Sequence, residues 1–479
     1  MKKQILLAGW MGWMCLSAAW GEVLLYDDFN DGIDATIWST PVNTSNNNRQ
    51  TTWVEVNGDG KAQLSGRSLL ATVEDYKATD YGGITVSGTF QHVSGNTFFH
   101  LVDSTNGLYS NQYQGIAQYG MEFRFRSDTP GFTGRWLDKG SGGSPTGVFL
   151  SSSAYLSSGA TLQNLASYMK DAQGVSFAFV DNGKGLASLK FTSLTDPTKQ
   201  WQQVYTYDLS AIPASALFGK IGFQNHEGAR DNLDNIQITA MRGGFSDSLD
   251  GPLVDRMNWT LRGGETSAVV IDDQGRLTLH NRSGVATRSE YTPTLSQGEM
   301  TGTLNISGDL TFGCDEDMIT FQTRSDNSLP ELSAHSQNGL QFQINIADGW
   351  NNLSIYQRVN DGIRNLTVLE SDTEIDFVSG NTYHFEIMDD GEIASILIYD
   401  ILDESNSAYY KVEAPMNEFY TKNFFVMYNR EGERTSYIDN FSLSYTMPPA
   451  TVPEPGTWCL LLLGMAGLFY HKKRTKREP

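Results

Sequence analysis

The sequence predicts an all-β fold built as two tandem two-sheet β-sandwiches. The chain of 479 residues contains 47 glycines but only 14 prolines, and its interior lacks long stretches of apolar helical periodicity. Short segments that alternate apolar and polar residues are separated by turns rich in Asp, Asn and Gly, which is typical of strands with one buried face. The same succession of segments occurs twice, about 200 residues apart.

The two copies begin alike. Each opens with an Asp-containing strand and then a tryptophan, Trp38 in the first copy and Trp259 in the second. Because the tryptophans hold matching places, we expect both to pack in a core. A strand, a polar turn and a second strand follow, as WVEVNGDGKAQLSG at 53–66 and VVIDDQGRLTLHN at 269–281.

The middle and the end of the copies also match. Residues 175–180 and 383–388 alternate apolar and polar side chains, and each segment runs into an Asn-Gly or Asp-Gly turn. These dipeptides supply the positive φ angles of a tight hairpin. Both copies close on Asn-x-Glu-Gly-x-Arg and then an Asp-Asn dipeptide, at 225–235 and 429–440. We expect that dipeptide to fix a turn into the last strand.

The repeats set the predicted domain boundaries. We expect one sandwich at 22–242 and the other at 243–447, each with about a dozen strands. Residues 1–21 and 448–479 fall outside both sandwiches. Within the first unit, residues 160–172 predict a short helix carried by a loop.

Several motifs give the sandwiches a family resemblance. They are an Asp-Gly-containing strand near the start of each unit, G-x-x-Y-H-F-E-I-x-D-x-G at 380–391 and Y-I-D-N-F-S-L at 437–443. The pattern resembles the concanavalin A-like, LamG-type jelly roll, and the second unit carries it better than the first. The resemblance implies a fold and leaves the ligand open.

The beginning of the chain predicts an export signal. Lys2 and Lys3 precede the apolar run 5–16, and residues 19–21 offer the small side chains that a signal peptidase recognises. We expect a signal peptide at 1–21 that is cleaved before Glu22. The chain then leaves the cytoplasm.

The end of the chain predicts a membrane anchor. The apolar run 458–470 is 13 residues long, and five cations follow within the last nine residues. A helix of that length spans roughly 20 Å, whereas the hydrocarbon core is about 30 Å thick. With flanking aromatic and basic residues to extend it, we expect a short transmembrane helix at 458–470 with its basic end in the cytoplasm.

The residues before this helix carry a second resemblance. Val452, Pro453, Glu454 and Pro455 precede the apolar run and the basic end, and together they resemble a PEP-CTERM sorting signal. The resemblance implies processing by an exosortase, a membrane cysteine protease-transpeptidase. It also implies a Gram-negative-type bacterium that makes exopolysaccharide, with the protein membrane-anchored before processing. The alternative is an ordinary tail anchor.

Charge and cysteines exclude some classes of function. The formal net charge is −21, which argues against a nucleic-acid partner, because phosphates need a basic face. Neutral glycans, divalent cations or simple solubility are compatible with it. If both ends are removed, Cys314 stands alone, so no intramolecular disulfide and no cysteine-based zinc site is expected.

The repeated closing motif raises the question of calcium. If the first and last strands of each unit are neighbours, carboxylates near the start meet carboxylates near the end, and calcium prefers such hard oxygen ligands. The alternative is structural, with Glu and Arg of the closing motif paired across a turn. The aspartates of the predicted calcium sites are Asp28 and Asp234 in the first unit and Asp247 and Asp439 in the second.

One stretch of the sequence partly matches a catalytic motif. Glu374 and Asp376 begin an E-x-D-x-x-E pattern that laminarinase-like glycosidases of this fold carry on one strand, but Ser379 stands at the last position. Without the final carboxylate a retaining double displacement cannot run. Nucleophile elbows, phosphate loops and HExxH motifs are also absent from the sequence. We therefore expect a protein without catalytic residues.

Two tryptophans are candidates for ligand contact. Trp136 and Trp350 lie next to Gly- and Asn-rich turns, and a tryptophan on a loop can stack on the face of a sugar. The alternative is that each anchors its loop by partial burial.

These predictions combine into one functional hypothesis with two alternatives. The protein is expected to be an exported, exosortase-sorted surface or matrix protein that binds exopolysaccharide or another glycan, or serves a structural role, without catalysis. The first alternative is a glycoside hydrolase or polysaccharide lyase whose active site the sequence does not reveal. The second is a structural adhesin that self-associates.

Overall fold

The computed structural model describes most of the chain between residues 23 and 446. The gaps are 41–52, 67, 96–97, 104–118, 139–145, 213–218, 226–228, 242–243, 248–251, 264–268, 289–301, 329–334, 347–351, 373–374, 417, 421 and 431–433. The predicted signal peptide at 1–21 and the predicted sorting signal and helix at 448–479 lie outside the described residues. None of the described helices combines the length and apolar character needed to cross a bilayer.

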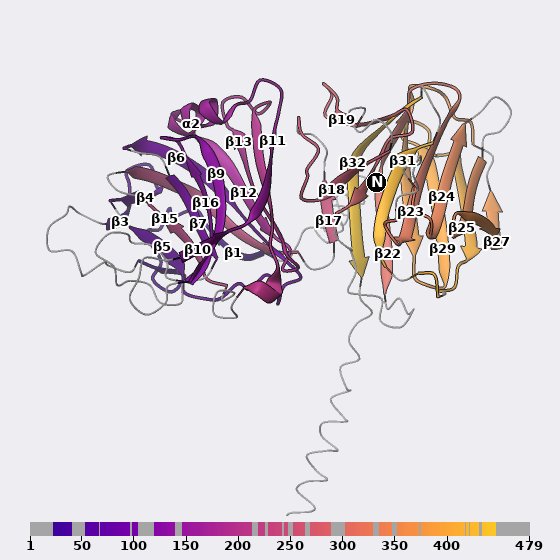
Figure 1. Cartoon of the computed structure of the whole chain (residues 1–479). Coiled ribbons are helices and arrows are strands. Elements are labelled where there is room, and N and C mark those ends of the chain that lie inside the picture. Colours follow the sequence, from indigo (N-terminus) through magenta and orange to yellow (C-terminus); the bar gives the residue numbers. More distant parts are fainter. Residues whose placement is uncertain are drawn as a thin grey trace, which may run out of the picture.

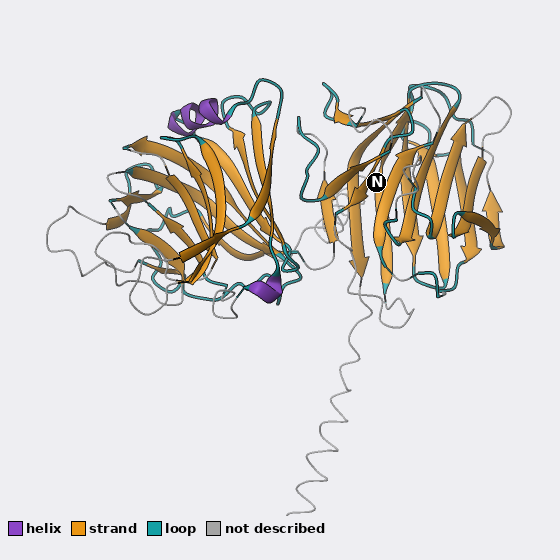
Figure 2. Ribbon diagram, viewed as in Figure 1, coloured by secondary structure: helices purple, strands orange, loops and turns teal. Residues whose placement is uncertain are grey.

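The described residues are nearly all β (Figures 1 and 2). The first set of elements comprises β1 (Val23–Asp27), β2 (Trp38–Ser39), β3 (Trp53–Val56), β4 (Ala62–Ser65), β5 (Leu69–Thr72), β6 (Ile84–Ser94), β7 (Phe98–Asp103), β8 (Tyr119–Arg126), β9 (Gly131–Asp138), β10 (Thr146–Phe149), β11 (Ser151–Leu156), α2 (Leu162–Lys170), β12 (Val175–Asp181), β13 (Leu186–Ser193), β14 (Gln200–Thr206), the 3-10 helix η2 (Leu209–Ala211), β15 (Ile221–Gln224) and β16 (Arg230–Ala240).

The second set contains strands alone among its described residues. It comprises β17 (Gly244–Asp247), β18 (Trp259–Arg262), β19 (Val270–Ile271), β20 (Leu277–His280), β21 (Gly284–Thr287), β22 (Thr303–Phe312), β23 (Asp317–Ser325), β24 (Gly339–Ile346), β25 (Asn352–Val359), β26 (Gly362–Asn365), β27 (Thr367–Asp372), β28 (Thr382–Asp389), β29 (Ile393–Asp400), β30 (Ser407–Glu413), β31 (Phe424–Asn429) and β32 (Thr435–Thr446).

The described strands form four antiparallel sheets, two in each sandwich, and the two sandwiches have the same strand order. The first long sheet has nine strands in the order β11-β14-β13-β12-β6-β16-β4-β3, with β1 also paired to β16. The second long sheet repeats it as β27-β30-β29-β28-β22-β32-β20-β19, with β17 paired to β32. The short sheets, of seven strands each, are β10-β9-β8-β7-β15-β5-β2 and β26-β25-β24-β23-β31-β21-β18. First and last strands are neighbours in both sandwiches, as expected. The boundary between 242 and 243 stays a prediction.

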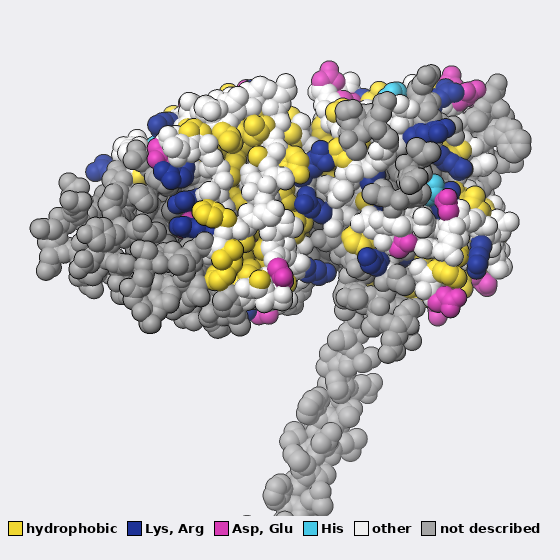
Figure 3. Space-filling view, viewed as in Figure 1, with side chains coloured by type: hydrophobic (Ala, Val, Ile, Leu, Met, Phe, Trp, Pro, Cys, Tyr) yellow, Lys and Arg dark blue, Asp and Glu magenta, His cyan; other side chains and the backbone are white. Residues whose placement is uncertain are grey.

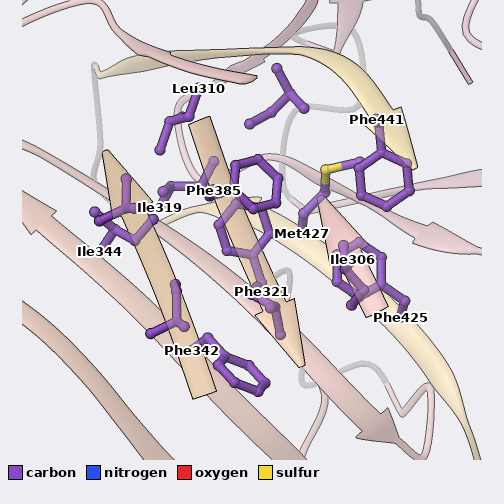
Figure 4. Packing of buried hydrophobic residues seen from close by; sticks show 14 of the residues in the cluster. Ile306, Leu310, Ile319, Phe321, Phe342, Ile344, Phe385, Phe425, Met427 and Phe441 are labelled. Atoms are coloured by element: carbon purple, nitrogen blue, oxygen red, sulfur yellow. The ribbon is translucent and has the colours of Figure 1, made fainter. Parts of the chain in front are cut away.

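Each sandwich has its own aromatic-rich core between its long and short sheets. In the first, Phe99 of β7 packs against Phe177 of β12 with ring centroids 4.8 Å apart. In the second, Phe321 of β23 stacks on Phe385 of β28 at 4.5 Å (Figure 4). Burial of each such side chain stabilises the fold by about 1.5–3 kcal/mol. Trp38 and Trp259 are buried, which confirms their prediction.

Local sequence explains the predicted hairpins and the helix. The turn between β12 and β13 places Gly183 at φ 64°, and the turn between β28 and β29 places Gly391 at φ 92°. Helix α2 begins after Thr161, whose side chain accepts a hydrogen bond from the backbone N–H of Asn164, while Asn164 in turn accepts from Thr161. The prediction of a helix within 160–172 is confirmed.

The prediction that the Asp-Asn dipeptides form turns before the last strands is wrong. They lie inside the long last strands β16 and β32, where Asn235 and Asn440 adopt φ angles of 51° and 49°. The pairing with β6 and β22 shifts register at these points, so each dipeptide forms a β-bulge rather than a turn before the strand. Gly88 and Gly308 face the bulges, and a Cβ at Gly88 would lie 3.0 Å from the carbonyl oxygen of Asp234.

A contact joins the first long sheet to the second sandwich. Gln202 of β14 donates from Nε2 to Oδ1 of Asp255 at 2.6 Å, and its Oε1 accepts from the backbone N–H of Arg256 at 3.0 Å. The guanidinium of Arg256 lies 5.1 Å from the ring centroid of Tyr155. An apolar cluster completes the contact and consists of Leu186, Val204 and Met257.

Candidate functional site

The aspartates of the predicted calcium sites are only partly brought together. Asp28 and Asp234 are close enough for their charges to interact: burial raises the pKa of Asp234 and the charge of Asp28 adds to that rise, while Lys61 opposes it. The Asp234 carboxylate accepts from the backbone N–H of Asn235 at 2.8 Å. These contacts make Asp234 part of the bulge.

The second unit gives the calcium prediction no stronger support. Asp439 accepts from the backbone N–H of Asn440 at 2.8 Å, so it repeats the bulge contact of Asp234. Asp247 pairs with Phe441 across β17 and β32, and its side chain lies outside the described part of the chain. Within the described ranges, no three His, Cys, Asp or Glu side chains gather as a metal site. Calcium therefore stays a prediction.

The structure also places one of the two candidate tryptophans and one residue of the glycosidase-like pattern. Trp136 lies on strand β9 and packs against the first core, so it is not carried by a loop as predicted. Side chains along β9 point alternately to the two faces of the sheet. The Gly-rich stretch of the sequence begins only after this strand ends at Asp138. Trp350 and Glu374 lie outside the described residues. Asp376 is exposed in the loop between β27 and β28.

The strongest candidate site lies on the outer face of the second short sheet. On β24, Leu340, Phe342 and Ile344 enter the core, so Gln341 and Gln343 project from the opposite face. The same alternation brings out further polar side chains from β25 and from the end of β31. We call this set the arginine–tyrosine face, and it consists of Gln341, Gln343, Tyr356, Arg358, Tyr428 and Arg430.

Hydrogen bonds organise the arginine–tyrosine face into two connected groups. Gln343 accepts through Oε1 from the Tyr356 hydroxyl at 2.8 Å and from Nη1 of Arg430 at 3.2 Å. Gln341 accepts from Nε of Arg358 and donates from Nε2 to the Tyr428 hydroxyl at 2.5 Å. Gln341 and Tyr428 are almost fully buried although they point away from the core. In the first group Tyr356 is also buried, whereas Gln343 and Arg430 are partly exposed and can be reached by a ligand.

A histidine and an aspartate flank the buried group. The ring of His335 lies 5.8 Å from that of Tyr428, and its Nε2 is 2.7 Å from Oδ1 of Asp361. Arg358 also donates to Asp361, at 2.8 Å. Burial lowers the pKa of His335, although the bond to Asp361 opposes this, and the bond from His335 lowers the pKa of Asp361. Burial raises the pKa of Tyr428 to about 12, so its hydroxyl stays protonated at neutral pH.

The equivalent face of the first sandwich has different chemistry. Glu122 of β8 is fully buried there and accepts from Nε of Arg135 at 2.9 Å, with Nε of Arg124 at 3.7 Å. Burial lowers the pKa of Arg124 and the charge of Glu122 opposes this. Arg124 also donates from Nε to the hydroxyl of Thr133 at 2.7 Å. Figure 3 shows Lys and Arg side chains on both sandwiches in this view, although the net charge is −21.

Sequence inspection misses the arginine–tyrosine face because its members come from three separate strands. The signal that could have found it is the segment LQFQINI at 340–346, where two glutamines alternate with core residues. Such a pattern also describes an ordinary exposed strand. The arginines at 358 and 430 distinguish this face from an ordinary exposed strand. Only the strand order brings those two positions beside 341 and 343.

Comparison with known proteins identifies the end of the chain. A family model described as the PEP-CTERM protein-sorting motif matches residues 451–474, which confirms the predicted motif that includes Val452, Pro453, Glu454 and Pro455. The motif indicates an extracellular, exosortase-sorted protein of the cell surface that is processed from a membrane-anchored precursor. Comparison with curated protein sequences gives no match.

Solved structures with a similar arrangement of strands include lectins. Peanut lectin with a 9mer peptide aligns at a TM-score of 0.33 and 11% identity, over 43% of this chain and 98% of that chain. Lectin I from Ulex europaeus, in complex with the methyl glycoside of α-L-fucose, aligns at 0.31 and 10%, over 40% and 92%. The VIP36 exoplasmic/lumenal domain in its Ca2+/Man3GlcNAc-bound form aligns at 0.31 and 10%, over 42% and 92%.

Proposed function

We propose that this chain is a non-catalytic glycan-binding protein, exported and sorted to the envelope or polysaccharide matrix of a Gram-negative-type bacterium. Both sandwiches are proposed to be concanavalin A-like jelly rolls of the LamG type. The sorting motif supports the location, because exosortase substrates reach the cell surface. Exopolysaccharide is the glycan that such a location offers.

The observation behind this proposal is the hydrogen-bonded group of Gln343, Tyr356 and Arg430 on the arginine–tyrosine face, in which Gln343 and Arg430 are partly exposed. Tyr356 and Arg430 both donate to one oxygen of Gln343, so the three side chains are fixed before any ligand arrives. Arg430 forms no ion pair with a described carboxylate, and most of its N–H donors remain free for sugar hydroxyls. Sites that hold sugars use such planar hydrogen-bonding groups, and pre-organised groups lose less entropy on binding.

Two further observations favour binding over catalysis. The glycosidase-like pattern has Ser379 where the acid/base carboxylate is required, and Asp376 is exposed on a loop rather than aligned on a strand. Beside the arginine–tyrosine face, Asp361 is engaged by His335 and Arg358. A retaining glycosidase needs two carboxylates about 5 Å apart.

The test is affinity electrophoresis of the full chain through gels that contain neutral and acidic polysaccharides. We expect retardation by at least one polysaccharide, and we expect Arg430→Gln to weaken that affinity about tenfold, the effect of one charged hydrogen bond. Arg282→Gln, at an exposed turn outside this face, is the matched control. Equal retardation of the two variants would contradict the role of the face. Release of reducing or unsaturated sugars from the gel polysaccharide would favour the hydrolase or lyase alternative.

A further inference from the structure

A second candidate site lies on the other sandwich, in a cavity of about 440 Å³ on the outer face of the first long sheet. On β12, Val175, Phe177 and Phe179 enter the core, so Ser176 and Ala178 face outward into the cavity. The polar groups that line it are the hydroxyls of Ser87, Thr89, Ser176 and Thr192, the amide of Asn235 and the ammonium group of Lys190.

Small outward side chains explain why the face is hollow here. On β6, Ser87 and Thr89 pair with Ala178 and Ser176 of β12, so four small side chains lie together on the outer face. Gly88 pairs with Phe177 on the core side, where a Cβ would lie 2.7 Å from Cδ1 of Ile236. A flat ring can approach such a floor of small outward residues closely.

Lys190 gives the cavity its charge. Its side chain is half-buried, and it forms no hydrogen bond or ion pair with any described residue. Asn235 is oriented by the Tyr26 hydroxyl, which donates to its Oδ1 at 3.0 Å, so its Nδ2 donors remain for a ligand. A cation without a partner, surrounded by hydroxyl and amide groups, is suited to an anionic group on a hydroxyl-rich molecule.

The same place in the second sandwich carries a carboxylate paired with a histidine. By strand register, Thr89 and Ser176 correspond to Asp309 and His384, which are paired at 2.7 Å. Asn440 donates to Asp309 at 2.7 Å. Burial alone would raise the pKa of Asp309, but the bonds from His384 and Asn440 outweigh it, so its pKa is lowered and the carboxylate stays ionised. At the place of Lys190 stands Leu397.

We propose that the cavity on the first long sheet binds an acidic sugar residue of a polysaccharide, through Lys190 on its carboxylate or sulfate and the surrounding hydroxyls on its ring. The inference extends the proposed glycan binding to a separate sandwich and names the ligand as anionic. Nucleic acid does not fit, because a chain of net charge −21 offers one such cation here and repels a continuous phosphate backbone.

The second sandwich contacts the same outer face beside this cavity. Gln202 stands opposite Lys190 in the register of β13 and β14, on the same outer face, and its amide is held by Asp255 and Arg256. The segment at 255–257 therefore covers part of the outer face on the β14 side of Lys190. A bound polysaccharide extends from Lys190 in the other direction, across β12 and β6.

Titration calorimetry of the full chain tests the inference with polygalacturonate, dextran sulfate and neutral dextran, at about 0.15 M salt, where the Debye length of about 8 Å screens the net charge. We expect one or both anionic polymers to bind and Lys190→Gln to weaken that binding about tenfold. Which polymer binds identifies the acidic group. Ala178→Leu, which fills the cavity without altering charge, is expected to weaken it as well.

Lys170→Gln, on the exposed end of α2, is the matched control for loss of one positive charge. The inference is wrong if neither anionic polymer binds, or if Lys190→Gln and Lys170→Gln have equal effects. Arg430→Gln separates this inference from the proposed function. It should leave polyanion binding at Lys190 intact, so the two sites can fail independently.

Discussion

The two sandwiches share one strand order and one core plan, yet the outer face beside the shared bulge carries different side chains in each. The bulge at Asn235 and Gly88 recurs at Asn440 and Gly308. Above it the first sandwich has an open cavity with Lys190, whereas the second has Asp309 paired with His384. Both copies therefore have the same backbone bulge, while the outward side chains around it differ.

The buried acid at the end of β12 and β28 shows the same divergence inside the protein. Asp181 accepts from the Tyr207 hydroxyl at 2.5 Å, whereas Asp389 accepts from Nε of Arg324 at 2.9 Å. Arg324 also donates to the carbonyl of Ala414 at 2.6 Å. One copy uses a neutral donor and the other a fully buried ion pair.

The largest expected effect comes from breaking that ion pair. Arg324→Met leaves Asp389 buried without its cation, and we expect a loss of about 3–5 kcal/mol in the stability of the second sandwich. Tyr207→Phe is the matched change in the first sandwich, with an expected loss of about 1 kcal/mol. Denaturant unfolding of each variant measures both values. Equal losses would show that the two buried acids do not differ as described.

A smaller effect is expected from pH on the first sandwich. Burial raises the pKa of Asp231 to about 6 despite its bond to His92, and an unfolded aspartate titrates near about 3.9. Between these values the folded state holds a proton that the unfolded chain has released, so stability falls as pH rises from about 4 to about 6, by on the order of 2 kcal/mol. Asp231→Asn should flatten this slope in urea titrations. An unchanged slope would exclude Asp231 as its source.

Exchange of the side chains at positions 190 and 397 tests whether charge alone makes the polyanion site on the outer face. Lys190→Leu should lower polyanion affinity about tenfold, whereas Leu397→Lys should not create a second site, because Asp309 and the ring of Tyr399 occupy that face. Calorimetric stoichiometry measures the outcome. A doubled stoichiometry in the Leu397→Lys variant would show that charge alone makes the site.

The smallest effect concerns the contact between the sandwiches. Gln202→Ala removes the bonds to Asp255 and Arg256, and a double-mutant cycle with Asp255→Ala should give a coupling energy of about 1–2 kcal/mol. The two unfolding transitions supply the measurement. A coupling near zero would mean that the two sandwiches unfold without support from this contact.

Much of the fold could be predicted because its signals are local. Alternation in 175–180 and 383–388, with turn dipeptides after each, defines the central hairpins from a few adjacent residues. The bulges were missed because an Asp-Asn dipeptide is equally typical of a turn, and only pairing with β6 or β22 decides. The repeated Ser-Gly pairs at 87–88 and 307–308 were the available signal.

The candidate sites were harder to predict because they are assembled across strands. The glycines near Trp136 led to the prediction that a loop carries it. The tertiary packing of β9 instead places Trp136 against the core. Arg430 reaches Gln343 only because β31 and β24 both flank β23. The spacing of Arg430 and Gln343 along the chain does not show that they are neighbours. The sorting motif, in contrast, is contiguous and could be identified directly.

The most direct test of the central claim is to incubate the purified full chain with exopolysaccharide from a producing bacterium and to measure both retention and polymer length. The account predicts saturable retention that Arg430→Gln weakens, with the polysaccharide unchanged in size after prolonged incubation. Shortening of the polymer, or absence of retention for every polysaccharide tested, would contradict it.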